Sequence, residues 1–401
     1  LTDLARADQR VGIVLDKTPF YPEGGGQVPD IGVITSDTAE FQVENTQRVG
    51  SLIVHSGKVV SGELSVGSEV LASVDKALRW STMRNHTATH LLHKALRMML
   101  GDHVVQAGSL VEPSRLRFDF THPVAVTPGE LIEVEKIVNE EILADDPVEA
   151  YETTLEQAKA DGAMALFSEK YGGTVRVIKI GNFSKELCGG THVSRTSQIG
   201  FFKILSESSV GAGLRRIEAV TGTAAYEYVR ERERLLSEVA EMLKTTPSQI
   251  PEAVNRLLDS LRVAEHQIEE LQKKSAASKA DELIGMASMI GDINFIGARV
   301  DTSDMDVLSS LADALADRLG TAVIVLGASA DNKALFVSKV TPDLVKRGFH
   351  AGNIIREVAK VAGGGGGGKP DFAQAGGRDI SKLDDAIAKA RELIEHQIGI
   401  S

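Results

Sequence analysis

Two short stretches of the chain hold side chains that can bind a metal ion. His86 and His90 are separated by three residues, and Cys188 and His192 repeat this separation about a hundred residues later. On a helix, residues four apart lie on one face, so the two imidazoles of the first pair can hold one ion. The second pair would add a thiolate and a third imidazole. Such a Cys-His₃ set suits zinc, whereas calcium and magnesium take oxygen ligands.

The histidine pair alone is weak evidence, because two histidines four apart on a helix are more often a surface pair than a metal site. Cys188 shifts the balance, since it is the only cysteine in 401 residues and two glycines follow it, which let the backbone turn tightly. We therefore expect one zinc ion bound by His86, His90, Cys188 and His192. His93, one turn beyond His90, is expected on the helix surface and outside the ligand set.

Only a folded domain with both helices and strands can bring the two pairs together. Apolar residues recur at helical spacing from Trp80 to Leu100, which predicts a helix for the first pair. The alternating run Val175–Ile180 predicts a strand whose end leads to Cys188. One ligand pair is thus expected on a helix and the other on a strand and its loop.

Several motifs in this order resemble the editing half of alanyl-tRNA synthetases. They are Thr18–Asp30 (TPFYPEGGGQVPD), Asn85–His90 (NHTATH), Cys188–His192 (CGGTH) and Gly213–Gly222 (GLRRIEAVTG). The run Gly363–Gly368, with AQAGG at 373–377, is similar to the C-terminal domain of the same enzymes. The resemblance covers nearly the whole chain and leaves no room for the aminoacylation domain of that family. It therefore implies a C-terminal fragment.

The resemblance implies a zinc-dependent ester hydrolase that removes serine or glycine from mischarged tRNA(Ala). Three consecutive glycines alone are more often a flexible hairpin, but Glu23 and Gln27 flank them here, and the resemblance makes this loop the rim of the editing pocket. Gln27 matches a residue implicated in that pocket. We expect Gln27, Glu23, Cys188 and Arg216 to serve catalysis. Adjacent strand residues point to opposite faces, so at most one of Arg215 and Arg216 would face a phosphate or terminal nucleotide.

The composition is that of an ordinary globular chain, with 25% charged and 42% hydrophobic residues. No apolar run approaches the length of a membrane span, and the first residues show no basic segment followed by a hydrophobic one. We therefore expect no membrane partner and a cytoplasmic location. A formal net charge of −12 argues against a general nucleic-acid binder. Binding of tRNA must therefore depend on particular segments.

The expected fold class is α+β with four parts. Residues 1–75 alternate in short runs and predict a small β-barrel-like unit, and residues 76–222 an α+β zinc-binding editing domain. Residues 223–290 predict two long helices with a break at Pro247 and Pro251, which suits an antiparallel hairpin. This segment could be a spacer or a homodimer surface. Residues 291–401 predict a compact α/β domain, which is a second candidate for a dimer surface.

The glycine run of this last domain is followed by Lys369, but Pro370 stands where a phosphate-binding P-loop has a hydroxyl residue, so a P-loop is not expected. It is either a flexible linker or a segment that approaches a nucleic-acid backbone closely, since Lys360, Lys369 and Arg378 surround it. The resemblance implies contact with the outer corner of tRNA.

Two other functions stay open. A zinc hydrolase of a non-tRNA ester would cleave simple esters and ignore mischarged tRNA. A structural zinc module that mediates assembly would have four closed ligands and no adjoining pocket.

Overall fold

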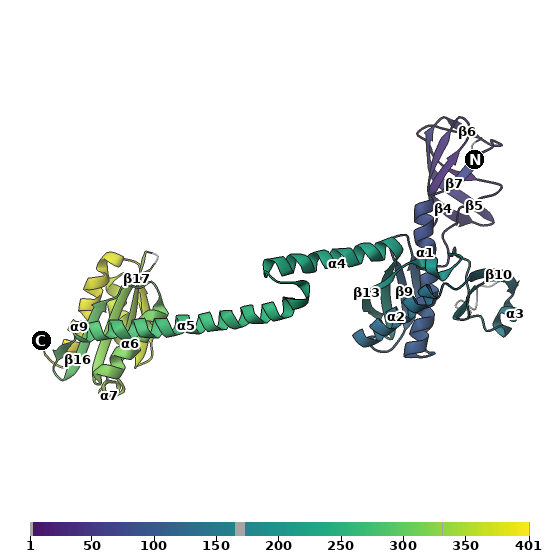
Figure 1. Cartoon of the computed structure of the whole chain (residues 1–401). Coiled ribbons are helices and arrows are strands. Elements are labelled where there is room, and N and C mark those ends of the chain that lie inside the picture. Colours follow the sequence, from purple (N-terminus) through teal and green to yellow (C-terminus); the bar gives the residue numbers. More distant parts are fainter. Residues whose placement is uncertain (1–2, 165–172, 331, 401) are drawn as a thin grey trace. The chain divides into compact units, whose positions relative to one another are not determined.

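The computed structural model describes residues 3–164, 173–330 and 332–400. Its residues cluster into two compact units, Leu1–Glu241 and Met242–Ser401 (Figure 1). Across the described ranges, no helix is both long enough and apolar enough to cross a membrane. The sequence predicts four parts, which is a finer division than these two units, and it stays a prediction.

The first unit begins with an antiparallel sheet of strand order β2-β5-β4-β3-β7. Its strands are β2 (Arg10–Val14), β3 (Gly32–Thr35), β4 (Glu40–Val49), β5 (Leu52–Ser61) and β7 (Leu71–Val74), and β1 (Leu4–Arg6) pairs with β6 (Glu63–Ser65) beside it. Alternate residues such as Phe41 and Val43 are buried in its core. Within the described residues β2 and β7 remain edge strands, so the sheet does not close into the barrel-like unit that the sequence suggested.

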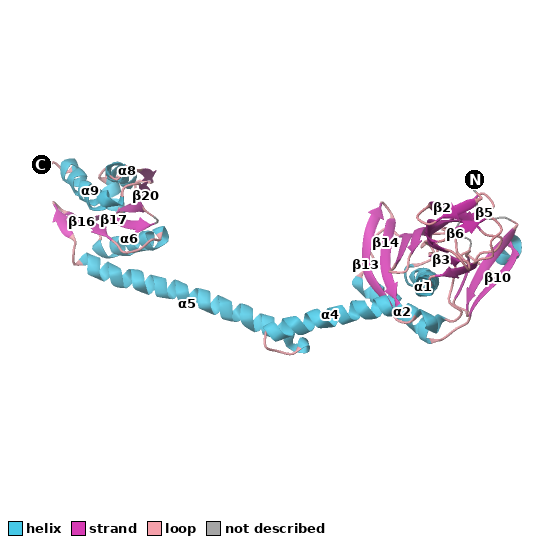
Figure 2. Ribbon diagram, turned by 90° about the horizontal axis from the view of Figure 1, so that it is seen from above, coloured by secondary structure: helices cyan, strands magenta, loops and turns pink. Residues whose placement is uncertain are grey.

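Helix α1 (Lys76–Leu100) carries the first histidine pair. Asp75 caps its start by accepting hydrogen bonds from the backbone N–H groups of Ala77 and Leu78. Every residue from Asn85 to His93 is buried, because the sheets of the first unit lie around the helix, which Figure 2 shows nearly end-on. The expectation that His93 lies on the helix surface is therefore wrong, since this part of α1 has no solvent-facing side.

Two further sheets complete the surroundings of α1. One has the order β13-β14-β9-β8 and packs with α2 against α1 around Phe118, Phe120 and Leu92. The other has the order β10-β11-β12, with α3 beside it. The elements are β8 (Gln106–Val111), β9 (Leu116–Thr121), α2 (Pro128–Leu143), β10 (Val148–Thr154), α3 (Leu155–Ala160), β11 (Thr174–Ile180), β12 (Ser184–Leu187), β13 (Phe202–Gly211) and β14 (Leu214–Thr221). Thr153 and Thr154 continue β10, so α3 begins only at Leu155.

The helical segment contains α4 (Gly222–Met242), a 3₁₀ turn (Pro247–Gln249) and α5 (Ile250–Ile284). The break falls where the prolines predicted it, and Pro251 occupies the first turn of α5, where its missing N–H costs no hydrogen bond. Helix α4 lies almost wholly in the first unit and α5 in the second. The expected hairpin pairing of these helices, and a dimer through them, stay predictions.

The second unit is a mixed sheet of order β15-β16-β17-β18-β20-β19 with helices on both faces (Figure 2). Ala322–Leu326 reads as a continuous apolar run because alternate residues of this strand enter two different cores. The elements are β15 (Ser288–Ile290), β16 (Ile293–Arg299), α6 (Met305–Leu319), β17 (Ala322–Ala330), β18 (Lys333–Val340), α7 (Pro342–Lys346), α8 (Ala351–Val361), β19 (Gly365–Gly368), β20 (Phe372–Gly377) and α9 (Leu383–Gln397). The expected α/β arrangement is present.

The glycine run forms the edge strand β19, which pairs with β20. A Cβ atom at Gly366 would lie 2.2 Å from the Cβ of Ala375, and one at Gly368 would lie 2.5 Å from the carbonyl oxygen of Phe372. The backbone needs glycine there for space. The glycine run is therefore a strand and not the flexible linker that the sequence also allowed.

Candidate metal centre and cavity

The structure brings His86, His90, Cys188 and His192 into one cluster, whose ligand atoms all lie within 4.8 Å of one another. Sγ of Cys188 is 3.3 Å from Nε2 of His86 and 3.4 Å from Nε2 of His192. Ligand atoms around a tetrahedral zinc lie roughly 3.3–3.8 Å apart, given metal–ligand bonds of about 2.0–2.3 Å. The spacing of the cluster therefore suits this ion.

Each imidazole directs one ring nitrogen away from the cluster, to a different partner. Nδ1 of His86 lies 2.7 Å from the amide oxygen of Gln27, and Nδ1 of His90 lies 2.7 Å from Oε2 of Glu186. An amide oxygen and a carboxylate only accept, so both Nδ1 atoms must carry a proton. The lone pair of the neutral ring is then on Nε2, which faces the cluster.

Nδ1 of His192 also carries a proton, and its partner is a hydroxyl group. Its Nδ1 lies 3.2 Å from Oγ1 of Thr87. That hydroxyl donates its own proton to the carbonyl oxygen of Met83 and accepts from the backbone N–H of Val193. Nδ1 of His192 must therefore donate, which again leaves Nε2 free to bind a metal.

Nε2 of His90 is buried and has no hydrogen-bond partner among the described residues. A buried nitrogen without a partner is costly unless something binds it. Together with the nitrogen and sulfur donor set, this atom indicates that the four residues fit a zinc ion.

Burial and charge set the protonation of this cluster. Burial alone would raise the pKa of Cys188, but His86, His192 and His90 hold it well below its ordinary value. Burial disfavours a charged His90, yet Glu186 and the thiolate of Cys188 raise the pKa of His90 to about 10. The pKa of His192 falls to about 3, through burial and the nearby charge of His86. The thiolate is thus ready for a metal, and His90 must lose a proton when one binds.

Glu186 forms a second buried contact on the far side of His90. Burial opposes its charge, but His90 and His93 lower the pKa of Glu186 to about 2. Nδ1 of His93 lies 3.2 Å from Oε1 of Glu186, and Ser184 donates to the same oxygen. This carboxylate therefore orients His90 and is itself held in place.

Gln27 links the glycine-rich loop to the second ligand pair. Its amide nitrogen donates to the hydroxyl of Thr191, and its amide oxygen accepts from the backbone N–H of Thr191 as well as from His86. Gln27 is fully buried, so both ends of its amide are occupied by protein groups. Its place in the structure is that of a residue that positions His86.

The two glycines after Cys188 differ in their surroundings. A Cβ atom at Gly190 would lie 2.0 Å from Cε1 of His86 and 2.9 Å from the amide oxygen of Gln27. Nothing lies within 4 Å of the corresponding position at Gly189. The motif therefore needs its second glycine for the close approach of His86.

A cavity of about 560 Å³ opens beside the cluster, and its size is typical of small-ligand sites. Of the expected site residues, Glu23, His86, His90 and Cys188 line it, whereas Gln27 and His192 lie behind the wall. Tyr21, Arg48 and Arg176 also line the cavity. The ligand cluster is thus accessible to a small molecule from one side.

Arg216 is not on this wall. It forms a two-point ion pair with Asp119, at 2.7 and 2.8 Å, and its neighbour Arg215 pairs with Glu207. The structure therefore places Arg216 in a contact between β14 and β9, away from the residues that line the cavity. Its catalytic role stays a prediction.

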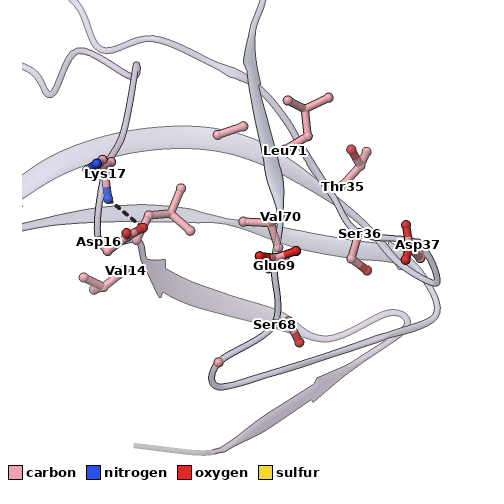
Figure 3. A pocket seen from close by; sticks show the side chains of 13 residues that line it. Val14, Asp16, Lys17, Thr35, Ser36, Asp37, Ser68, Glu69, Val70 and Leu71 are labelled. Carbon is pink, nitrogen blue, oxygen red and sulfur yellow. Dashed lines mark hydrogen bonds between the residues drawn. The ribbon is translucent and has the colours of Figure 1, made fainter.

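A second hollow, of about 870 Å³, lies on the N-terminal sheet. Figure 3 shows it, with Asp16, Lys17 and Glu69 among the side chains that line it. Its lining includes none of the four clustered residues and none of the expected catalytic residues. The smaller cavity is therefore the candidate site.

The sequence did not lead us to expect Glu186 and Thr87 beside the cluster, or Arg48 and Arg176 on the cavity wall. Glu186 could have been predicted, because it lies two residues before Cys188 in an extended segment, and alternate residues of a strand share a face. Thr87 had none, since its role depends on how the loop after Cys188 folds back on α1.

Three family models match parts of the chain. The model for the Threonyl and Alanyl tRNA synthetase second additional domain matches residues 175–218, and that for tRNA synthetases class II (A) matches residues 2–78. The DHHA1 domain model matches residues 292–396. Two of the three describe parts of aminoacyl-tRNA synthetases, which is the class of protein that these similarities indicate.

Relatives that match along the whole chain show which kind of aminoacyl-tRNA synthetase it is similar to. Alanine--tRNA ligase of Pelotomaculum thermopropionicum is 50% identical over 395 residues, which cover 98% of this chain and 45% of the relative. That of Acetivibrio thermocellus is 49% identical over 400 residues, which cover 100% and 46%. The chain is thus homologous to alanine--tRNA ligases along its whole length, and it spans about half the length of these relatives.

Among solved structures, the C-Ala domain from Aquifex aeolicus alanyl-tRNA synthetase is 31% identical. The aligned part covers 28% of this chain and 96% of the C-Ala chain, with a TM-score of 0.25.

Proposed function

We propose that the chain hydrolyses the ester bond between serine or glycine and the 3′ end of tRNA(Ala), with one zinc ion at the cluster. The observation that carries this proposal is that His86, His90 and Cys188 belong both to the ligand cluster and to the wall of the cavity. A small group that enters the cavity therefore meets the ligand atoms directly. The match to the synthetase second additional domain supports tRNA as the substrate.

A bound zinc ion supplies Lewis acidity for ester hydrolysis. The protein groups prepare its site: Gln27 orients His86, Glu186 orients His90, and Thr87 orients His192. Glu23 is exposed on the cavity wall, where its carboxylate can accept a hydrogen bond from a water or from the amino group of the ester. Cys188 is held as a thiolate by the surrounding histidines.

A second site for this hydrolysis has a chemical reason. A pocket that accepts alanine cannot exclude the smaller glycine by size, and it rejects one added hydroxyl only weakly. A separate hydrolytic cavity corrects both errors. This reasoning supports serine and glycine as the amino acids removed.

Binding of tRNA by the second unit is part of the same proposal. Lys360 on α8, Lys369 after β19 and Arg378 after β20 are all exposed around the glycine strand. Nothing lies within 4 Å of a Cβ position at Gly365, so a phosphate backbone can come close to this strand. The match to the DHHA1 domain covers these residues.

A structural zinc module is the main rival. It is disfavoured by the cavity that reaches three of the four ligand residues, because structural zinc sites are closed. Hydrolysis of a non-tRNA ester is disfavoured by similarity to alanine--tRNA ligases over the whole chain.

The test is release of serine from serine-charged tRNA(Ala) by the purified chain, with and without a metal chelator. We expect release that the chelator abolishes and added zinc restores. A chain that binds zinc yet leaves the charged tRNA intact while it cleaves simple esters would contradict the proposal.

A further inference from the structure

Two arginines lie on the wall of the cavity, and they come from different sheets. Arg48 is near the end of β4, opposite Ile53 of β5, and Arg176 is on β11, opposite Glu152 of β10. Both line the same cavity as His86, His90 and Cys188. No ion pair between either arginine and a carboxylate occurs in the part of the chain that the structure describes.

Arg176 is held in a fixed orientation by the metal-ligand loop. Its Nη1 donates to the carbonyl oxygens of Cys188, at 3.0 Å, and of Gly190, at 2.7 Å. Among the described residues, Nε and Nη2 have no hydrogen-bond partner. These two atoms form the edge of a guanidinium that binds carboxylate or phosphate oxygens with two parallel hydrogen bonds.

Arg48 is exposed, and its side chain has no hydrogen bond or ion pair within the described ranges. Glu23 is the only carboxylate among the residues that line the cavity, so positive charge predominates on this wall. Both guanidinium groups act on one phenol: burial raises the pKa of Tyr21 to about 12, while Arg176 and Arg48 oppose this rise. The two charges therefore meet in one region of the cavity, on a chain whose net charge is −12.

We propose that Arg48 and Arg176 form a phosphate subsite for the terminal nucleotide of the RNA, beside the metal cluster. This assignment rests on the proposed function, since it takes the 3′ end of tRNA as the occupant of the cavity. Arg176 provides a preoriented two-point contact, and Arg48 adds an exposed charge at the surface. The subsite holds the nucleotide while its ester lies against the ligand cluster.

The test uses adenosine 5′-monophosphate and adenosine as probes, because they differ only in the phosphate. Their affinities for the zinc-loaded full chain are measured by calorimetry. We expect the monophosphate to bind about fivefold more tightly than adenosine, as for one partly exposed ion pair. Arg48→Gln should lower this ratio to about twofold, because the contact with Arg176 remains, and Arg48→Lys should retain most of it, with the affinity for adenosine unchanged in both.

Arg230→Gln is the matched control, because Arg230 is also exposed, lies on α4 and does not line the cavity. It should leave the ratio as in the wild type. Arg176 is not substituted, since its contacts to the ligand loop would confuse binding with folding. Equal affinities of the two probes, or a ratio that Arg48→Gln leaves unchanged, would overturn the subsite.

Hydrolysis of serine-charged tRNA separates this inference from the proposed function. We expect Arg48→Gln to raise KM and to leave kcat near the wild-type value. If the wild type does not hydrolyse the ester, the proposed function fails, while the ratio of the two probe affinities still decides the subsite. If hydrolysis proceeds with an unchanged KM in Arg48→Gln, the subsite fails and the function stands.

Discussion

The amide oxygen of Gln27 lies 2.7 Å from Nδ1 of His86, although the two residues are 59 positions apart in the chain. This contact joins the glycine-rich loop to α1 and determines which nitrogen of His86 faces the metal cluster. Glu186 does the same for His90. Gln27 and Glu186 therefore determine which nitrogen of each imidazole faces the cluster.

Gln27→His should lower hydrolysis of the mischarged tRNA about 10- to 100-fold, the usual effect of removing an outer partner of a metal ligand. A neutral imidazole has one acceptor and one donor nitrogen, so it cannot replace the three contacts of the Gln27 amide, which accepts from His86 and from the backbone N–H of Thr191 and donates to the Thr191 hydroxyl. Serine release at saturating tRNA is the measurement, with folding verified by circular dichroism. Gln47→His is the control, because Gln47 is exposed on β4. Wild-type turnover in a folded Gln27→His variant would argue against this role.

Glu186→Gln should weaken zinc binding by about 10- to 100-fold with little change in shape. The substitution removes the negative charge that faces Nδ1 of His90 and leaves a neutral amide in its place. Competition with a chromophoric chelator measures the affinity. Glu156→Gln, on the surface of α3, should bind zinc as the wild type does. Equal affinity of the wild type and Glu186→Gln would show that Glu186 serves only the packing of the core.

His90→Ala and Cys188→Ala should each reduce the zinc content from about one ion per chain to well below one, because the chain has one cysteine and the described residues contain one Cys-His₃ cluster. Elemental analysis after dialysis tests this. His103→Ala, which removes an exposed histidine outside the cluster, should retain the metal. We also expect Cys188→Ala to suppress serine release. If His90→Ala retains a full ion, His90 is not a ligand.

The cluster of His86, His90, Cys188 and His192 could be predicted from the sequence, because it depends on residue type and local spacing. The partners could not, since Gln27, Thr87 and Glu186 reach the histidines only through the packing of three sheets around α1. The same packing explains the error over His93. A periodic helix predicts one buried face, but α1 is buried on all sides near the site. The edge strand made of glycine was also hidden, because no side chain pattern marks it.

Tyr21 should make the folded chain less stable at high pH. Burial raises the pKa of Tyr21 to about 12, from about 10 in an unfolded chain. The neutral phenol therefore contributes its full stabilisation below pH 10, and this contribution falls between pH 10 and 12 as the unfolded state ionises first. Its upper limit is about 2–3 kcal/mol, at 1.36 kcal/mol for each pKa unit.

The phenol of Tyr21 also donates to the carbonyl oxygen of Gly24, so Tyr21→Phe should cost about 1 kcal/mol at pH 8. The stability difference between wild type and variant should shrink as the pH rises above 10. Urea unfolding at several pH values measures it. Tyr226→Phe, at an exposed site, should follow the wild type at every pH. A constant difference for Tyr21→Phe would contradict the raised pKa.

A chain that ends after Glu241 should retain zinc and hydrolysis at saturating tRNA, because residues 1–241 form a compact unit that contains the whole cluster. It should bind tRNA more weakly. The slope of log affinity against log salt should fall in magnitude by about 0.7–0.9 for each RNA phosphate that the shortened chain no longer neutralises. Unchanged affinity and slope would show that the second unit does not bind tRNA.

Gly189 and Gly190 should differ in the substitutions that they tolerate. The two residues look interchangeable in the sequence, yet open space surrounds one and the ring of His86 touches the other. A methyl group at 189 would project into that space, whereas the same group at 190 would push an imidazole off its amide partner. A saturation library over this pair should therefore give a permissive first position and a second at which only glycine survives selection for zinc-dependent activity.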